Sequence, residues 1–361
     1  MNLSVAHGVR ALLLPFWLAV ALSPALHAEP LRAKDQVLFM PGVARVVEGG
    51  QLEIDVHAWL YEKERMHGVN SLLSRYLKID VQRLSRAART RFDQRTGLFH
   101  TESSDERVID IVVDATGLQI ALPPTADNGR TNMRLLIDAP SPRPDEDVVR
   151  FHALTAPGDT RRFNGQAIVV PPVGLSVVSD IDDTIKHTHV RNTHEMMLNT
   201  FTRRFDPVPG MAPMYRTLAG EPGTRFHYVS ASPIQLFPPL AEFLRAGDFP
   251  VGSVHLREST TWRSLLPGKG ASRAHKLAVI EQLMADFPQR RFLLVGDSGE
   301  ADPEIYAELA RKHPALVEAI VIRDVTQEGR ESPRYFATFD GVDPARWHVL
   351  VDGDAWPVPA R

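Results

Sequence analysis

The C-terminal half of the chain alternates short apolar runs with helical patterns, and this alternation restricts the possible folds more than any other feature. The apolar runs begin after the turn-forming segment 171–174 and lie at 175–178, 225–229, 251–256, 291–295 and 319–322. Between and after them, the segments near 213–220, 238–246, 273–286 and 303–312 have the periodicity of helices. Apolar strands that alternate with helices are typical of a parallel sheet covered on both faces. We therefore predict an α/β domain with a Rossmann-like parallel sheet over residues 171–361.

Residues 34–170 have a different pattern. Short stretches rich in valine and isoleucine are separated by turn-forming residues, with the clearest stretches at 43–47, 52–60, 108–113, 117–122 and 133–138. This pattern predicts a smaller, β-rich N-terminal domain built as an antiparallel sandwich.

One helical insert interrupts the predicted strands. Its apolar residues recur at the spacing of a single helical stripe, at Leu77, Val81, Leu84, Ala88 and Phe92. Basic residues outnumber acidic ones in this region, which is consistent with two arrangements. The helix either packs against the protein with a solvated outer face, which we favour, or lies on an anionic lipid surface.

Charge and cysteine content exclude several classes of function. The formal net charge of −3 over 361 residues gives no reason to expect a nucleic-acid partner. The sequence contains no cysteine, so disulfide partners, thiolate metal sites and cysteine nucleophiles are excluded.

The first 28 residues have the features of a secretory signal peptide. Arg10 precedes an apolar run at 11–22, and small residues then offer cleavage after Ala25 or Ala28. The run is shorter than the roughly 20 residues that a membrane-spanning helix needs. We therefore expect an exported protein, either periplasmic or secreted, with an uncleaved N-terminal anchor as the alternative.

Polar side chains follow the apolar runs at the points where the predicted strands end. The first run leads into Ser179-Asp180-Ile181-Asp182-Asp183-Thr184, the second into Ser230-Ala231-Ser232, and the fourth into Gly296-Asp297-Ser298. Lys276 lies in the helical segment before the fourth run. Because the carboxyl ends of parallel strands meet at one edge of a sheet, we expect these groups to converge there.

Such a set of groups fits the hydrolysis of a phosphomonoester. A magnesium ion with oxygen ligands would reduce the repulsion between an anionic nucleophile and the phosphoryl group. Asp180 could serve as nucleophile and metal ligand, and Asp182, two residues on, as general acid and base. Asp297 would complete the metal site. Lys276 would neutralise charge in the transition state.

The hydroxyl groups at the same strand ends are candidates for substrate binding. We expect Ser230 to donate a hydrogen bond to a phosphoryl oxygen, and Thr184, Ser232 and Lys276 to contact the substrate beside it. Taken singly, each of these residues has an ordinary alternative as a helix cap, a turn residue, part of a calcium loop or a solvated lysine. Their common position after strands favours catalysis.

The same residues resemble the motifs of the haloacid-dehalogenase superfamily. The run from Val177 to Thr184 resembles its first motif, Ser230 its second, Lys276 its third, and Gly296-Asp297 followed by Asp302 its acidic fourth. The resemblance implies a haloacid-dehalogenase-like fold for residues 171–361. It also implies that magnesium is held by Asp180, the backbone carbonyl of Asp182 and Asp297, with Asp302 in support.

A narrower resemblance covers roughly residues 165–330. The segments 179–186, 199–201, 209–211, 228–233 and 296–300 are similar to the catalytic domain of the fungal actin-patch phosphatidate phosphatases and their bacterial relatives. This resemblance implies hydrolysis of phosphatidate or of related lipid phosphates. The alternatives are a phosphatase of small soluble phosphomonoesters and, from another class, a non-catalytic surface-binding protein.

Two further segments are candidates for contacts with substrate or membrane. Residues 187–212 are expected to form a short cap that carries possible headgroup ligands at His187, His189, Arg191, Asn192 and His194. An apolar and basic segment could make a peripheral contact with an anionic membrane, although burial in the core is the favoured alternative. Its residues are Arg257, Trp262, Arg263, Leu265, Leu266, Lys269 and Arg273.

Overall fold

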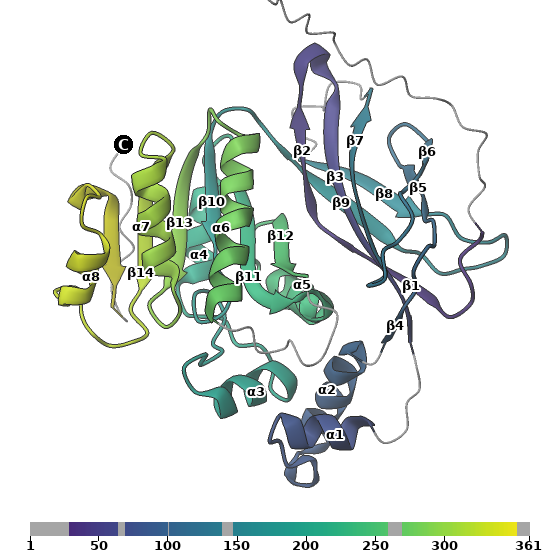
Figure 1. Ribbon diagram of the computed structural model, residues 1–361, viewed down its shortest axis with the longest axis horizontal. Helices are drawn as coiled ribbons and strands as arrows, with labels where there is room; N and C mark the ends of the chain where they lie inside the picture. The colour runs from purple at the N-terminus through teal and green to yellow at the C-terminus, as the bar shows by residue number, and fades with distance from the viewer. Residues whose placement is uncertain (1–28, 64–68, 100, 139–146, 259–268, 352–361) are drawn as a thin grey trace, which may run out of the picture.

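The structure is a computed structural model that describes residues 29–63, 69–99, 101–138, 147–258 and 269–351. The predicted signal segment and most of the apolar and basic segment around Trp262 lie outside these residues. Two sheets are formed, one from each half of the chain (Figure 1). Every helix in the described part of the chain is too short or too polar to cross a bilayer.

The C-terminal half contains the predicted parallel sheet. All neighbouring strands pair in parallel, in the order β12-β11-β10-β13-β14-β15. The five predicted apolar runs correspond to five of these strands, and β15 is an additional edge strand. The strands are β10 (Leu175–Ser179), β11 (Arg225–Pro233), β12 (Gly252–Arg257), β13 (Arg291–Asp297), β14 (Val317–Arg323) and β15 (Trp347–Leu350).

Helices cover both faces of this sheet, so the α/β class is confirmed. Consecutive residues Val177 and Val178 of β10 belong to different apolar clusters, because side chains of a strand alternate between its two faces. One face packs against α3 (Thr193–Phe201), α4 (Met211–Ala219) and α5 (Phe237–Ala246). The other face packs against α6 (Lys269–Asp286), α7 (Asp302–Lys312) and α8 (Pro333–Thr338).

The N-terminal half forms one continuous mixed sheet of nine strands, in place of the purely antiparallel sandwich that we predicted. The difference lies in β2 and β9, which are distant in sequence and pair in parallel. The sheet curls so that β1 comes to face β8: the rings of Phe39 in β1 and Phe151 in β8 are 5.1 Å apart although three strands separate them in the sheet order. The strands are β1 (Asp35–Met40), β2 (Gly42–Val46), β3 (Leu52–Lys63), β4 (Thr101–Ser103), β5 (Asp110–Val113), β6 (Leu118–Ala121), β7 (Arg130–Ile137), β8 (Val148–Ala153) and β9 (Asn164–Val170).

The helical insert consists of several short pieces, so the prediction of one continuous helix was wrong. Helices α1 (Val69–Tyr76) and α2 (Arg86–Thr96) are separated by a 3₁₀ turn at Val81–Arg83, and another turn, Gly97–Phe99, follows α2. The side chain of Asp80 caps the N-terminus of the 3₁₀ turn, and the side chain of Ser85 caps the N-terminus of α2. These two caps divide the segment.

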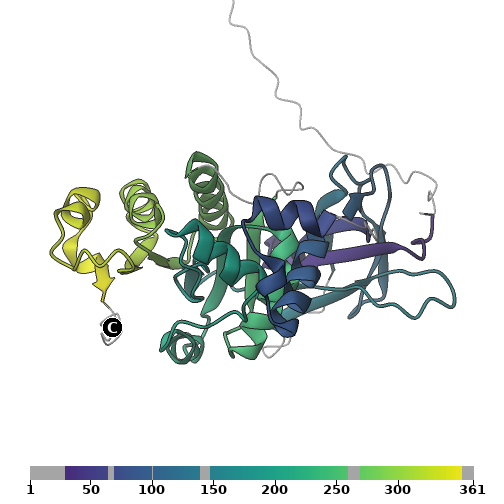
Figure 2. The same cartoon turned by 90° about the horizontal axis from the view of Figure 1, so that it is seen from below.

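The insert packs against the C-terminal half rather than presenting its apolar side to solvent. Leu77, Phe92 and Phe99 are buried in the same apolar cluster as Phe201 of α3. In Figure 1 the insert helices lie below α5 and β4 and to the right of α3, and Figure 2 shows them from below, in blue, beside the teal and green elements of the C-terminal half. The favoured arrangement, a packed helix with a solvated outer face, is therefore the one observed.

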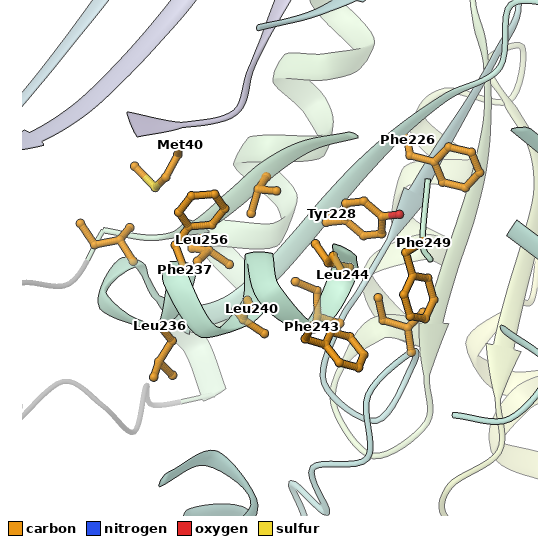
Figure 3. Close-up of a cluster of buried hydrophobic side chains, with 14 of the residues drawn as sticks. Met40, Phe226, Tyr228, Leu236, Phe237, Leu240, Phe243, Leu244, Phe249 and Leu256 are labelled. Atoms are coloured by element: carbon orange, nitrogen blue, oxygen red, sulfur yellow. The ribbon is translucent and has the colours of Figure 1, made fainter. Parts of the chain in front are cut away.

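The two halves also meet along the strands. Segment 171–174, the predicted domain boundary, lies between β9 and β10, and Arg290 donates hydrogen bonds to the carbonyls of Pro171 and Val173 in it. The amide of Val254 in β12 donates to the carbonyl of Pro41. Met40 of β1 joins the apolar cluster of the C-terminal half close to Phe237 and Leu256 (Figure 3).

Candidate active site

Three carboxylates meet at the carboxyl edge of the parallel sheet. Asp180 directly follows β10, Asp297 is the last residue of β13, and Asp302 is the first residue of α7. Each is at most 1% exposed, and each offers an oxygen within 4.8 Å of the other two. The sequence prediction that these three residues converge is confirmed.

The carboxylate cluster carries more negative charge than the surrounding protein neutralises. Burial raises the pKa of both Asp180 and Asp297 well above the ordinary value, and the neighbouring carboxylates raise it further. Burial also raises the pKa of Asp302. Among the described residues, the buried Oδ2 of Asp297 has no hydrogen-bond partner. An unpaired carboxylate oxygen among three converging carboxylates fits the needs of a hard divalent cation.

Lys276 supplies the positive charge at this site. Its Nζ lies 2.5 Å from Asp302 Oδ1, 2.9 Å from Asp180 Oδ1 and 3.0 Å from Glu300 Oε2. Burial alone would lower the pKa of Lys276, but these carboxylates raise it well above its ordinary value, so the amine is protonated. Lys276 therefore lies where we predicted. The contact with Glu300 was not predicted, although this residue stands three positions after Asp297.

Asp182 is held by a separate set of partners. Its carboxylate accepts hydrogen bonds from Ser230 Oγ at 3.0 Å and Ser232 Oγ at 2.8 Å, and from Thr188 Oγ1 at 2.8 Å. Lys186 Nζ lies 2.7 Å from its Oδ1. Burial alone would raise the pKa of Asp182, but Lys186 and the hydroxyl groups lower it below the ordinary value. Asp182 is therefore ionised in the free protein.

The predicted hydroxyl ligands are close to the site and are engaged with its carboxylates. Thr184 is fully buried and donates to Asp180 Oδ2 at 3.0 Å. Ser230 and Ser232 donate to Asp182, as described above. Lys186 and Thr188 were missed from the sequence. Lys186 stands four residues after Asp182. This spacing brings two side chains together in a regular helix, but it predicts no contact in an irregular turn.

A tight turn after the first motif brings Thr188 back to Asp182. Asp183 has a left-handed backbone with a φ of 59°, and its carboxylate accepts the backbone N–H groups of Thr188, His189 and Val190 at 2.7 Å each. Asn199 of α3 donates from Nδ2 to the carbonyl of Thr188 at 3.0 Å. The predicted cap thus begins with a fixed turn rather than with an open loop.

The five polar residues predicted in the cap have different surroundings. Asn192 caps the N-terminus of α3 through hydrogen bonds from the amides of His194 and Glu195. His187 is partly buried, and its ring centroid lies 6.2 Å from that of His189. His189, Arg191 and His194 are exposed. A pocket of about 320 Å³ beside the first motif is lined by His187, His189, Arg191 and Asn192, with Asp183 and Arg323.

A glycine at the end of β13 makes room for the acidic cluster. A Cβ atom on Gly296 would lie 2.4 Å from Asp302 Oδ2 and 2.8 Å from the ring of Tyr306. Three residues on, Gly299 donates its N–H to Asp297 Oδ1 at 2.6 Å. A side chain at position 296 would therefore push Asp302 away from Lys276 and Asp297.

Comparison with known proteins identifies the segment that carries this site. Residues 175–324 match the family described as "Phosphatidate phosphatase APP1, catalytic domain". The phosphatidate phosphatase APP1 of Saccharomyces cerevisiae is 37% identical over 170 residues, and an uncharacterized protein of Schizosaccharomyces pombe is 34% identical over 179 residues. Each alignment covers 46% of this chain and 28% of the relative, so the chain spans little more than a quarter of the curated relatives it matches.

Among solved structures, that of a carbohydrate esterase aligns over 90% of each chain with 10% identity and a TM-score of 0.19, a similarity too weak to inform the fold or the function. The informative similarity is that of residues 175–324, which include Asp180, Asp182, Ser230, Lys276, Asp297 and Asp302. This segment of the chain is thus similar to a phosphatidate phosphatase catalytic domain, and the similarity includes every residue of the buried site.

Proposed function

We propose that this chain is a magnesium-dependent phosphatase that forms a phospho-aspartate on Asp180 and hydrolyses phosphatidate or a related lipid phosphate. The observation that carries the proposal is the buried meeting of Asp180, Asp297 and Asp302 with Lys276 at the carboxyl edge of a parallel sheet. The similarity of residues 175–324 to a phosphatidate phosphatase catalytic domain supports both the reaction and the class of substrate.

The reaction has two steps, which use Asp180 and Asp182 in different roles. In the first step, a carboxylate oxygen of Asp180 attacks phosphorus, and the bond from phosphorus to the lipid oxygen breaks. The leaving oxygen takes a proton through Asp182. In the second step, Asp182 accepts a proton from water, which attacks the acyl phosphate and releases inorganic phosphate. Asp180 is then a free carboxylate again, and Asp182 returns to its ionised state when it passes its proton to the departing phosphate or to solvent.

The charge on Asp182 identifies the source of the first proton. Lys186 and the hydroxyl groups hold Asp182 ionised, so the free enzyme has no proton on this residue to give to the leaving oxygen. The second pKa of phosphomonoesters lies near 6, so a minority of the substrate molecules at pH 7 is the monoanion, which still carries one proton. We infer that this proton enters with the substrate and is relayed by Asp182. The ionised form of Asp182 is also the form that the second step requires.

Magnesium fits the acidic cluster on electrostatic grounds. Asp180, Asp297, Asp302 and Glu300 carry up to four negative charges against the single positive charge of Lys276. A phosphate group could not approach such a site without another cation. Bound Mg²⁺ would neutralise the phosphoryl oxygens, with Asp180, Asp297 and the backbone carbonyl of Asp182 as ligands and Asp302 in support.

We also propose that the enzyme acts outside the cytoplasm, in the periplasm or after secretion. The support is the apolar run at 11–22 and the small residues that follow it. Expression of the full chain in a bacterium, followed by N-terminal sequencing of the exported product, tests this. Cleavage after Ala25 or Ala28 is expected, and a cytoplasmic, uncleaved product would contradict the proposal.

The test of the activity compares one carboxylate with a matched control. Asp180→Asn removes the nucleophilic charge with little change of shape, whereas Asp340→Asn makes the same change at an exposed position. Both variants and the wild type are assayed on dioleoyl phosphatidate in mixed micelles, with Mg²⁺ and with EDTA, and on glycerol phosphate. We expect turnover only with Mg²⁺, loss of turnover in Asp180→Asn alone, and preference for the lipid.

Each alternative result has a definite meaning. Activity of Asp180→Asn would refute the nucleophile, and activity in EDTA would refute the metal. A preference for glycerol phosphate would point to a phosphatase of soluble esters. Inactivity of the wild type on every ester would leave a non-catalytic binding protein. Transfer of ³²P from labelled phosphatidate to the protein, at a peptide that contains Asp180, would establish the covalent step.

A further inference from the structure

A large groove lies between the helical insert and the C-terminal half, beside the candidate active site. Its volume is about 1600 Å³, larger than the 300–1,000 Å³ of most small-molecule pockets. One wall is the end of α2 with the turn that follows, and the other walls are the segment after α3 and the helix α5. The insert belongs to the N-terminal half, so both halves of the chain build this groove.

The lining combines apolar surface with positive charge. Leu98 of the insert, Phe205 after α3 and Phe243 of α5 contribute apolar side chains from three different elements. Four arginines and two histidines also line the groove, against two acidic residues. Arg204 is exposed and makes no hydrogen bond or ion pair through its side chain with the residues that the structure describes. An anionic amphiphile matches this combination, because it brings both an apolar body and a negative charge.

The insert wall is fixed in place by buried hydrogen bonds. Arg95 Nη1 donates to the carbonyls of Thr200 at 2.7 Å and Arg203 at 2.9 Å, and Arg91 Nε donates to the carbonyl of Thr202 at 2.7 Å. These carbonyls lie at the C-terminal end of α3, where the helix leaves backbone acceptors unsatisfied. The groove is therefore formed before any ligand binds.

The inner end of the groove adjoins the residues that hold Asp182. His187 lines the groove and directly follows Lys186, which pairs with Asp182. Asn199 also lines it and donates to the carbonyl of Thr188, whose hydroxyl donates to Asp182. The groove and the carboxylate site thus share the segment 186–189, and a molecule with its phosphate at Asp180 would reach the groove across this segment.

We propose that this groove binds the acyl chains of the lipid phosphate, and that the N-terminal insert is part of the substrate site. The inference rests on the proposed function, and it extends that function by naming where the apolar part of the substrate lies. Arg204 at the open side would face the negative charge of neighbouring headgroups. A sugar phosphate or a nucleotide would leave the apolar walls uncovered.

The test fills the groove from two sides without touching the catalytic residues. Gln94 on α2 and Ala246 on α5 are exposed lining residues, so tryptophan at either position is expected to fold. Arg89 and Arg245 are exposed residues of the same helices that do not line the groove, and Arg89→Trp and Arg245→Trp are the matched controls. The kcat/KM of each variant is measured on dioleoyl phosphatidate and on dibutyryl phosphatidate, with the urea midpoint as a check of folding.

We expect Gln94→Trp and Ala246→Trp to lower kcat/KM on the dioleoyl lipid by about tenfold or more, because several methylene groups lose their apolar contacts. The same variants should change kcat/KM on the dibutyryl lipid less than about twofold, and the controls should resemble the wild type on both. Arg204→Glu should raise KM for the dioleoyl lipid in anionic micelles and less so in neutral ones.

Equal losses on both lipids, or no loss on either, would overturn the groove proposal while the phosphatase function stands. The second result would also leave the groove open to a peptide or another partner. A wild-type enzyme that hydrolyses soluble esters but neither phosphatidate would instead refute the lipid function, and the groove proposal with it. The two failures are therefore distinguishable.

Discussion

Removal of one metal ligand is expected to stabilise the metal-free protein while it abolishes metal binding. Asp297 lies within 4.8 Å of Asp180 and Asp302, and at an effective dielectric constant of about 20 each like-charged pair costs about 3.5 kcal/mol. Attraction to the charge of Lys276 offsets about the repulsion of one of the two like-charged pairs that involve Asp297. Asp297→Asn keeps an acceptor for the Gly299 amide and removes the charge. Burial and the neighbouring carboxylates also raise the pKa of Asp297 well above its ordinary value, so protonation near pH 7 removes part of this cost. The free energy of unfolding in EDTA should therefore rise by up to about 3 kcal/mol, and most clearly at alkaline pH.

Urea unfolding followed by circular dichroism, with EDTA or with saturating Mg²⁺, measures both effects. At a Mg²⁺ concentration of 100 times its Kd, the wild type should gain about 2.7 kcal/mol, and Asp297→Asn should gain nothing. Asp340→Asn, at an exposed position, should behave as the wild type under both conditions. The reasoning would be refuted if Asp297→Asn were less stable than the wild type in EDTA, or if Mg²⁺ stabilised both proteins equally.

Three other predictions concern the insert, the acidic cluster and a buried histidine. Arg95→Met leaves carbonyls at the end of α3 unpaired and should lower the free energy of unfolding in urea by about 2 kcal/mol, against less than about 0.5 kcal/mol for the exposed Arg89→Met. Gly296→Ala forces Asp302 aside and should reduce phosphatase turnover at least about tenfold; full activity would contradict the crowding seen here. Burial lowers the pKa of His227 well below 6.5, so the unfolded chain binds a proton first as the pH falls, and His227 alone should lower the free energy of unfolding by about 2 kcal/mol between pH 7 and pH 5, in addition to the share of the buried His255. Urea midpoints at the two pH values should show a smaller drop in His227→Gln, and an unchanged drop would count against His227 as its source.

Most of the C-terminal fold and the centre of its site could be predicted from the sequence. The runs at 175–178 and 291–295 are continuous and apolar because both faces of their strands are buried, and such runs are the clearest sign of a parallel sheet. Asp180 and Asp297 stand directly at the ends of these runs, so their meeting followed from the topology. The edge strand β15 was missed because Trp347–Leu350 is short and only partly apolar.

Features that depend on distant contacts could not be predicted. The parallel pairing of β2 with β9 joins segments more than 100 residues apart, and nothing local in either strand specifies its partner. The partners of Asp182 depend on the left-handed turn at Asp183, which no regular periodicity indicates. The insert shows why apolar spacing alone can mislead: the stripe was real, but the capping residues Asp80 and Ser85 divide it into separate turns.

The insert can dock only after the segment that binds it has been synthesised. Arg95 and its first acceptor, the carbonyl of Asn199, are 104 residues apart, which a ribosome needs roughly 5 to 20 s to add. Short helices and hairpins form within microseconds. The insert is therefore made long before its binding surface exists, and Phe92 and Phe99 remain exposed to solvent for that interval. A chaperone that recognises apolar segments therefore has a target in residues 69–99 of the nascent chain.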